Sequence, residues 1–137
     1  MPTAEMGTVP GFREGQGTLS VTARREGRTD VLRLEGELDL RTVAGLRTRL
    51  AEALERGDGD LVVDLTAVGF LDSSGLAALL NALRRLTRMG RQLALACDEG
   101  PVLRVLQVTR LDGTFPVYAS AEAALDAIAR VPRRRDA

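Results

Sequence analysis

The stretch LTAVGFLDSSGLAALLNALRRL, from Leu65 to Leu86, carries the clearest information about the fold. An apolar segment ends in the polar run Asp72-Ser73-Ser74-Gly75, and a stripe of leucines with helical spacing follows it. Free backbone N–H groups in the first turn of a helix attract negative charge, so a serine placed there can carry a phosphate. The pattern therefore predicts a strand, a short polar turn and a long helix, with Ser73 or Ser74 at the helix N-terminus.

Upstream of this stretch, the sequence predicts two strands, a helix and a third strand. Apolar and polar residues alternate over residues 19–23 and residues 31–38, as in a hairpin with one solvated face. Residues 42–56 have the three-and-four spacing of an amphipathic helix. Residues 60–66 form a short apolar run, which is typical of a strand covered on both faces.

Downstream, the alternation of strands and helices continues. Residues 93–97 (LALAC) read as a buried strand, and Pro101 opens the next helix. Residues 115–118 (FPVY) predict an edge strand, because a proline has no N–H for a sheet ladder, and Ser120 caps a last helix. We therefore expect an α/β fold, with a mixed, mostly parallel sheet of about five strands and about four helices packed mainly on one face.

The chain length of 137 residues suits a single domain. Residues 1–17 are rich in Gly, Pro and Thr and show no hydrophobic period, so we expect a flexible leader there. The three consecutive arginines near the other end predict a basic tail over residues 133–137. The folded domain is expected to span residues 18–132.

The composition argues against several classes of function. The 19 basic residues, all arginines, balance 19 acidic residues, so charge gives no reason to expect direct nucleic-acid binding. The chain has no histidine, which excludes a Ser-His-Asp triad, a Cys-His pair and a histidine-ligated metal within it. We therefore expect no metal, no cofactor, no catalytic residues and no enzymatic activity.

The single cysteine and the lack of long apolar runs bear on the compartment. Cys97 has no partner for an internal disulfide and lies in a strand pattern, so we interpret it as a small buried hydrophobe. No stretch approaches the roughly 20 apolar residues that cross a bilayer, so membrane insertion is not expected. These features predict a cytoplasmic protein.

The run Asp72-Ser73-Ser74-Gly75 has two readings. Asp and Ser are favoured helix caps, so the run taken alone favours an ordinary helix start. Asp72 as a catalytic carboxylate lacks a base, a metal-ligand cluster or a phosphate loop. Gly75 has no side chain, which predicts that an approaching partner would meet little obstruction there.

Three pieces of the sequence together carry a resemblance to a known family. They are LEGELD at Leu34–Asp39, LVVDL at Leu61–Leu65 and FLDSSGL at Phe70–Leu76. In this order and spacing, residues from about Leu19 to Val131 resemble a STAS domain, the fold of bacterial anti-sigma factor antagonists.

The resemblance implies a partner-switching cycle. In that family the anti-sigma factor is also an ATP-dependent serine kinase, and it phosphorylates the serine that corresponds to Ser73. The unphosphorylated antagonist binds the anti-sigma factor and frees the sigma factor, the phosphorylated form does not bind, and a phosphoserine phosphatase resets the cycle.

The resemblance also implies which residues contact the partner: Asp39, Asp72, Ser73, Ser74, Gly75, Leu76 and Leu111. Without it, Asp39 and Ser74 read as helix-cap residues, and Leu76 and Leu111 read as core leucines. Many relatives have glycine just before the position of Leu111, where this chain has Arg110. This departure concerns the shape of that loop.

Two other functions remain open from the sequence. The first is a STAS subunit that regulates a membrane transport complex by docking onto it. The second is a small-molecule hydrolase or nucleotide-binding enzyme, against which the missing histidine and phosphate loop count. The intact Asp72-Ser73-Ser74-Gly75 run favours the phosphorylation switch.

Overall fold

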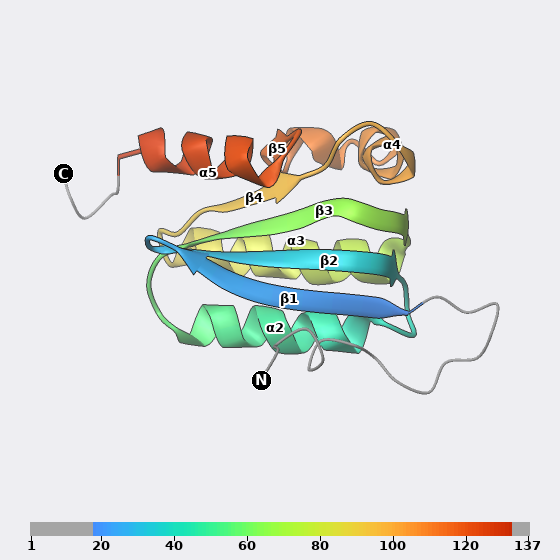
Figure 1. Ribbon diagram of the computed structural model, residues 1–137, viewed down its shortest axis with the longest axis horizontal. Coiled ribbons are helices and arrows are strands. Elements are labelled where there is room, and N and C mark those ends of the chain that lie inside the picture. Colours follow the sequence, from blue (N-terminus) through green and yellow to red (C-terminus); the bar gives the residue numbers. More distant parts are fainter. Residues whose placement is uncertain (1–17, 133–137) are drawn as a thin grey trace.

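A five-stranded sheet forms the centre of the computed structural model, which describes residues 18–132 (Figure 1). The sheet order follows the chain: β1 (Leu19–Glu26), β2 (Thr29–Leu38), β3 (Asp60–Leu71), β4 (Leu93–Ala96) and β5 (Val117–Tyr118). Strands β1 and β2 are antiparallel, and every later neighbour is parallel. The mixed, mostly parallel sheet is therefore confirmed. The predicted leader over 1–17 and basic tail over 133–137 lie outside the described residues, and the domain limits stay a prediction.

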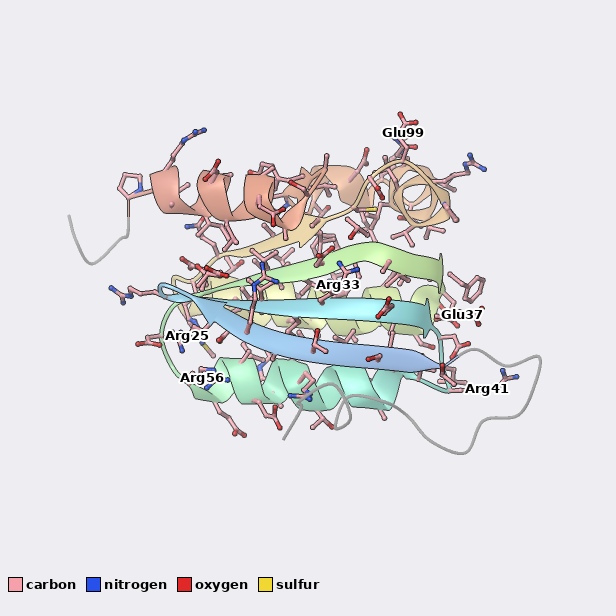
Figure 2. The ribbon with its side chains drawn as sticks, viewed as in Figure 1. Arg25, Arg33, Glu37, Arg41, Arg56 and Glu99 are labelled. Carbon is pink, nitrogen blue, oxygen red and sulfur yellow. The ribbon has the colours of Figure 1, made fainter. Side chains whose placement is uncertain are left out.

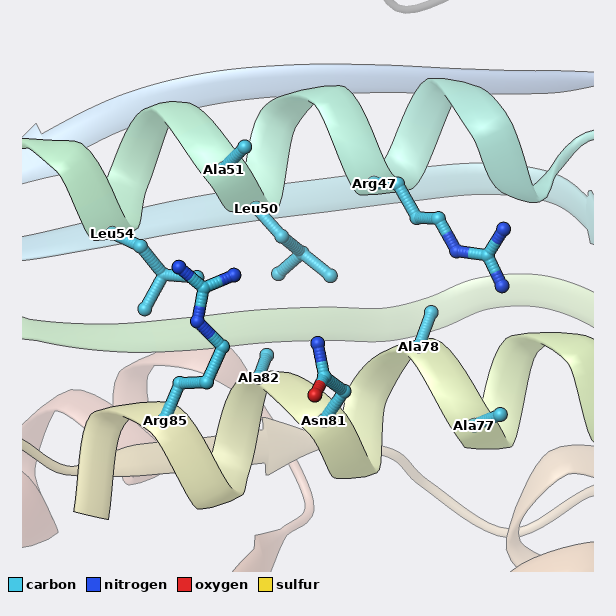
Figure 3. Close-up of a pocket in the computed structure, with 9 residues that line it drawn as sticks. All are labelled: Arg47, Leu50, Ala51, Leu54, Ala77, Ala78, Asn81, Ala82 and Arg85. Atoms are coloured by element: carbon cyan, nitrogen blue, oxygen red, sulfur yellow. The ribbon is translucent and has the colours of Figure 1, made fainter. Parts of the chain in front are cut away.

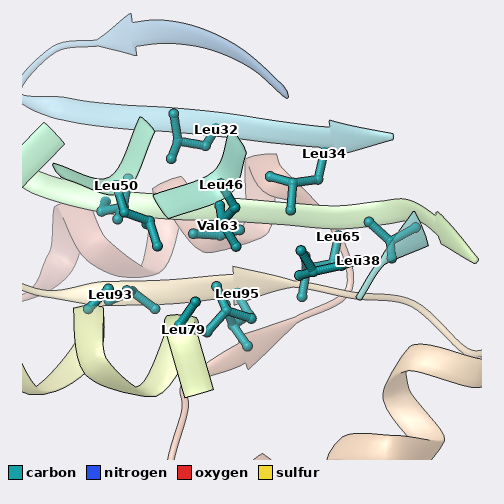
Figure 4. Packing of buried hydrophobic residues seen from close by; sticks show 14 of the residues in the cluster. Leu32, Leu34, Leu38, Leu46, Leu50, Val63, Leu65, Leu79, Leu93 and Leu95 are labelled. Atoms are coloured by element: carbon teal, nitrogen blue, oxygen red, sulfur yellow. The ribbon is translucent and has the colours of Figure 1, made fainter. Parts of the chain in front are cut away.

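In the described part of the chain, four α-helices cover the sheet unequally: α2 (Val43–Glu55), α3 (Ser73–Arg88), α4 (Pro101–Val108) and α5 (Ala121–Arg130). Alternate residues of β3 divide between the two faces. Val63 and its same-face neighbours pack with α2, α3 and α4, as Figure 4 shows in part, whereas Val62 packs with α5. The helices thus lie mainly on one face, as the sequence predicts.

Part of the other face remains solvated where α5 does not reach. On β2, Arg33 and Glu35 are exposed and alternate with the buried Leu32 and Leu34. Arg33 forms an ion pair with Asp64 on β3, with a distance of 3.2 Å between Nη1 and Oδ2. The period-two alternation in the sequence therefore marks a half-solvated strand.

Every strand differs from its predicted bounds by one or more residues, and β3 differs the most. β3 continues beyond Thr66 to Leu71, because its backbone keeps pairing with β2 as far as the Leu38–Leu71 pair. The last strand is shorter and begins at Val117, while Phe115 is a buried core residue. Its position at the sheet edge, beside β4 only, is confirmed.

The two ends of the sheet differ in their surface chemistry. Figure 2 shows Arg25 and Arg56 at one end, where both form ion pairs with Asp30 at 3.9 and 3.1 Å. Glu37 and Arg41 lie at the opposite end, beyond which β2 leads into α2 (Figure 2). That second end also holds the start of α3.

Candidate functional site

The candidate site lies where β2 and β3 end side by side. Leu38 pairs with Leu71, and the N–H of Asp72 donates to the carbonyl oxygen of Leu38 at 3.1 Å. Asp39 and Asp72 therefore follow the carboxyl ends of two neighbouring parallel strands. In open α/β sheets this edge is the usual place for a binding site.

Asp72 caps helix α3. Its Oδ1 accepts hydrogen bonds from the backbone N–H groups of Ser74 at 2.9 Å and Gly75 at 3.3 Å. Its backbone is extended, as an N-cap residue requires. The capping interpretation is thus confirmed for Asp72, and the bonds hold its carboxylate beside Ser73.

Ser73 is the first residue of α3, and its side chain is exposed. Within residues 18–132, its hydroxyl group forms no hydrogen bond. Ser74 is half-buried, so the two serines differ in accessibility. Ser73 presents the more accessible hydroxyl of the pair.

The carboxylate of Asp72 changes what the helix start offers to an anion. The N–H groups of Ser74 and Gly75 are the donors that a phosphate at a helix N-terminus would use. Both already donate to Asp72. A phosphate on Ser73 would therefore project outward beside a second negative charge, with two of the first-turn donors occupied.

Gly75 faces the core, which corrects the sequence-based explanation of why a glycine stands there. The residue is buried, and a Cβ atom there would lie 2.6 Å from Leu38 Cγ and 2.7 Å from Leu71 Cδ1. The interpretation that its missing side chain leaves room for a partner is therefore wrong. The small residue instead lets α3 pack closely on the ends of β2 and β3.

Asp39 organises the turn between β2 and α2. Its Oδ1 accepts from the N–H groups of Arg41 at 2.9 Å and Thr42 at 3.2 Å. The hydroxyl of Thr42 donates to the carbonyl of Glu37 at 2.8 Å. Asp39 is half-buried and caps this turn. The N-cap residue of α2 is Thr42, so the interpretation of Asp39 as a helix cap is not borne out.

Leu76 and Leu111 are both half-buried and pack against the main core cluster. Leu76 lies in the first turn of α3, where its N–H donates to the carbonyl of Asp72 at 3.1 Å. Leu111 starts the short 3₁₀ helix η1 (Leu111–Gly113), a separate element after α4. Both leucines have the core role that the sequence allows, and Leu76 also adjoins Ser73.

Arg110 has a backbone conformation that glycine usually provides. Its φ of 64° is in the left-handed region, where Arg110 is the only non-glycine among residues 18–132. The arginine therefore keeps the tight turn between α4 and η1. At this position an arginine adopts the left-handed conformation that glycine adopts more readily.

The profile of the STAS domain matches residues 20–124. The chain belongs to the STAS domain family. It is 33% identical to the anti-sigma F factor antagonist of Paenibacillus polymyxa over 89 residues, which are 64% of this chain and 76% of that protein.

Solved structures share the fold of this STAS chain. The crystal structure of an anti-sigma factor antagonist from Mycobacterium paratuberculosis has a TM-score of 0.76 and 27% identity, over 81% of this chain and 94% of that one. The Bacillus antagonist SpoIIAA is known in two forms. The unphosphorylated form has a TM-score of 0.69 and 26% identity, over 82% and 98% of the two chains. The phosphorylated form has a TM-score of 0.62 and 30% identity, over 79% and 98%.

Two apolar residues of the STAS site were not predicted. Leu40 is 74% exposed and follows Asp39, and Phe70 is 48% exposed on the strand that leads to Asp72. Leu40 lies outside the apolar stripe of α2, which begins at Val43. This position outside the stripe is the sequence feature from which its exposure could have been predicted. Exposed apolar residues beside polar groups are common in protein-binding surfaces.

Other groups in the STAS chain offer less chemistry. Burial, with a smaller contribution from Asp98, raises the pKa of the Cys97 thiol to about 11. Such a thiol is a poor nucleophile at neutral pH, in agreement with the interpretation of Cys97 as a buried hydrophobe. Over residues 18–132 no three potential metal-ligating His, Cys, Asp or Glu residues gather, and no helix there has the length and apolar character to span a membrane.

Proposed function

We propose that this chain is an anti-sigma factor antagonist that is switched by phosphorylation of Ser73. The unphosphorylated form binds an anti-sigma factor kinase and thereby frees the sigma factor. Phosphorylation by that kinase ends the binding. The exposure of Ser73 at the start of α3 is the observation that carries the proposal, and the names of the similar proteins support it.

The physical basis of the switch is local charge. A phosphoserine adds about −1.5 to −2 charges at neutral pH. In an interface, this charge would stand beside Asp72, whose carboxylate is fixed by its own hydrogen bonds. Like charges that are brought together in an interface cost several kcal/mol, which corresponds to an affinity loss on the order of a thousandfold.

The fold is proposed to stay the same in both states. Beneath Ser73, the α3 turn is anchored by the contact of Gly75 with Leu38 and Leu71. The modified hydroxyl lies outside this contact. SpoIIAA, which shares the fold in both its unphosphorylated and phosphorylated forms, supports this view.

The partner surface is proposed to surround Ser73. Its polar members are Asp39, Asp72 and Ser74, and its apolar members are Leu40, Phe70, Leu76 and Leu111. A few well-packed side chains near the centre of an interface commonly supply most of the binding energy. The most exposed of the apolar members, Leu40 and Phe70, are the proposed anchors. Gly75 acts indirectly, because it sets the position of the α3 turn.

In this cycle the chain is a substrate and a binding partner rather than an enzyme. A phosphoserine phosphatase would remove the phosphate and restore binding. Both reactions take place where ATP and the sigma factor are found, so we propose the cytoplasm as the location. Neither reaction requires a cofactor or metal held by this chain.

The test is phosphorylation by candidate anti-sigma kinases with Mg-ATP, followed by intact mass. The wild type is expected to gain one phosphoryl group and Ser73→Ala none, while Ser73→Asp fails to bind the kinase. Ser120→Ala is the matched control, because Ser120 also stands at a helix start but on α5. Modification of Ser74, or undiminished binding by Ser73→Asp, would reject the site. Recovery of a membrane ATPase instead of a kinase from lysate would reject the function.

A further inference from the structure

A groove of about 270 Å³ runs between α2 and α3 on their outer side (Figure 3). Residues of both helices line it: Arg47, Leu50, Ala51, Leu54, Ala77, Ala78, Asn81, Ala82 and Arg85. Its lining begins at Ala77, one turn beyond Ser73, and continues toward the far end of α3. The groove is therefore separate from the Ser73 turn.

The floor of the groove is apolar and is formed by short or buried side chains. Leu50, Leu54, Ala78 and Ala82 form it from the two helices. Ala51 and Ala77, which also line the groove, each carry only a methyl group. The backbone of a docked segment therefore has room to approach both helices closely. A helix fits such a trough, because an apolar stripe on one side of a helix can lie along it.

The rim of the groove is positively charged. Arg47 and Arg85 are exposed, and within residues 18–132 neither guanidinium group forms an ion pair or a hydrogen bond. Among the residues that the structure describes, no acidic residue lines the groove, and α3 contains none along its whole length. The exposed Arg84 and Arg88 add to the positive charge of α3. The rim is therefore complementary to an acidic partner.

Arg47 and Arg85 lie about two helical turns apart along the groove. Figure 3 shows α2 and α3 running in the same direction, with Arg47 near one end of the groove and Arg85 opposite Leu54 at the other. The seven residues from Arg47 to Leu54 rise about 10 Å at 1.5 Å per residue. This is about two helical turns, so carboxylates at positions i and i+7 of a docked helix would meet both guanidinium groups.

We propose that the groove between α2 and α3 docks an acidic amphipathic helix of a partner protein. Carboxylates two turns apart pair with Arg47 and Arg85, and small apolar residues between them lie on the floor. A second copy of this chain is a poorer occupant, since two positive rims would face each other. A lipid surface is poorer too, because the apolar floor is recessed between the two helices. The proposal does not depend on phosphorylation of Ser73.

The test uses a synthetic helical peptide of about 18 residues, long enough to hold a helix, with Glu at i and i+7 and Leu and Ala at i+3 and i+4. Backbone amide shifts in NMR spectra of the full chain are expected to map saturable binding to the groove. Arg47→Glu with Arg85→Glu should weaken binding at least about tenfold. Arg104→Glu with Arg130→Glu, on α4 and α5, changes net charge equally and should have no effect.

A peptide with Lys in place of both Glu residues is expected to bind at least about tenfold more weakly. Circular dichroism of each variant confirms that the fold is retained. Equal binding of the Lys peptide, shifts centred elsewhere, or no saturable binding would overturn the proposal. Two further results would overturn the proposal if the Glu peptide failed to bind. They are self-association of the chain and binding of the chain to phosphatidylglycerol vesicles, in either case abolished by the Arg47 and Arg85 double variant.

Discussion

Replacement of Gly75 by alanine would place a methyl group in the contact between α3 and the ends of β2 and β3. The new Cβ would lie 2.6 Å from Leu38 Cγ, 2.7 Å from Leu71 Cδ1 and 2.8 Å from Leu38 Cδ2. Carbon atoms in favourable contact are about 3.5–4.0 Å apart. Leu38 and Leu71 are 0% and 4% exposed, so neither side chain has open space into which it can turn.

Two opposing terms decide the size of the effect. Alanine is favoured over glycine inside a helix by about 1 kcal/mol. An extra methyl group in a packed core costs about 1–3 kcal/mol, and overlap with two buried side chains places this case near the upper value. We therefore expect Gly75→Ala to lower the free energy of unfolding by about 2 kcal/mol.

Urea unfolding followed by circular dichroism measures this change. The matched control is Gly113→Ala, because a Cβ at Gly113 would meet no atom within 4 Å. Its free energy of unfolding should stay within about 0.5 kcal/mol of wild type. If Gly75→Ala were as stable as wild type or more stable, the close packing that positions Ser73 would be refuted.

Three further predictions follow from the same structure. Asp72→Ala should lower the free energy of unfolding by about 1 kcal/mol in urea titrations, whereas Asp72→Asn, which keeps a cap acceptor, should change it little; equal losses would contradict the capping role. Burial raises the pKa of the Cys97 thiol to about 11. The native state therefore keeps a proton that the unfolded state releases above about pH 9. The free energy of unfolding should fall between about pH 9 and pH 11 by up to about 1.4 kcal/mol per pH unit. Urea denaturation of wild type and Cys97→Ala at several pH values measures this fall. If both proteins lost free energy of unfolding equally with pH, Cys97 would not be its cause. Leu40→Ala with Phe70→Ala should leave urea stability nearly unchanged but weaken kinase binding at least about tenfold in titration calorimetry; unaltered affinity would remove both residues from the interface.

The sequence was sufficient for most of the architecture because its hydrophobic periods are clean. The leucine stripe of α3, the alternation in β1 and β2 and the serine cap at Ser120 each have a local physical cause. The extent of β3 was missed, since its continuation to Leu71 depends on pairing with β2, a segment distant in sequence. Local patterns do not report such pairing.

The candidate site was predictable in part. The capping motif indicated that Ser73 would stand at a helix start, and the structure adds its exposure. The sequence-based prediction that position 75 faces a partner was wrong. Only the packing of α3 against Leu38 shows that this position faces the core. The exposure of Leu40 and Phe70 depends equally on tertiary structure, since an apolar residue is buried more often than not.

The most direct test of the proposed switch is the affinity of the chain for its anti-sigma factor kinase before and after phosphorylation of Ser73. Titration calorimetry with both forms, prepared from one batch and checked by mass, gives the two dissociation constants. The added charge beside Asp72 should weaken binding by at least about a hundredfold, while circular dichroism stays unchanged. Equal dissociation constants for the two forms would contradict the switch.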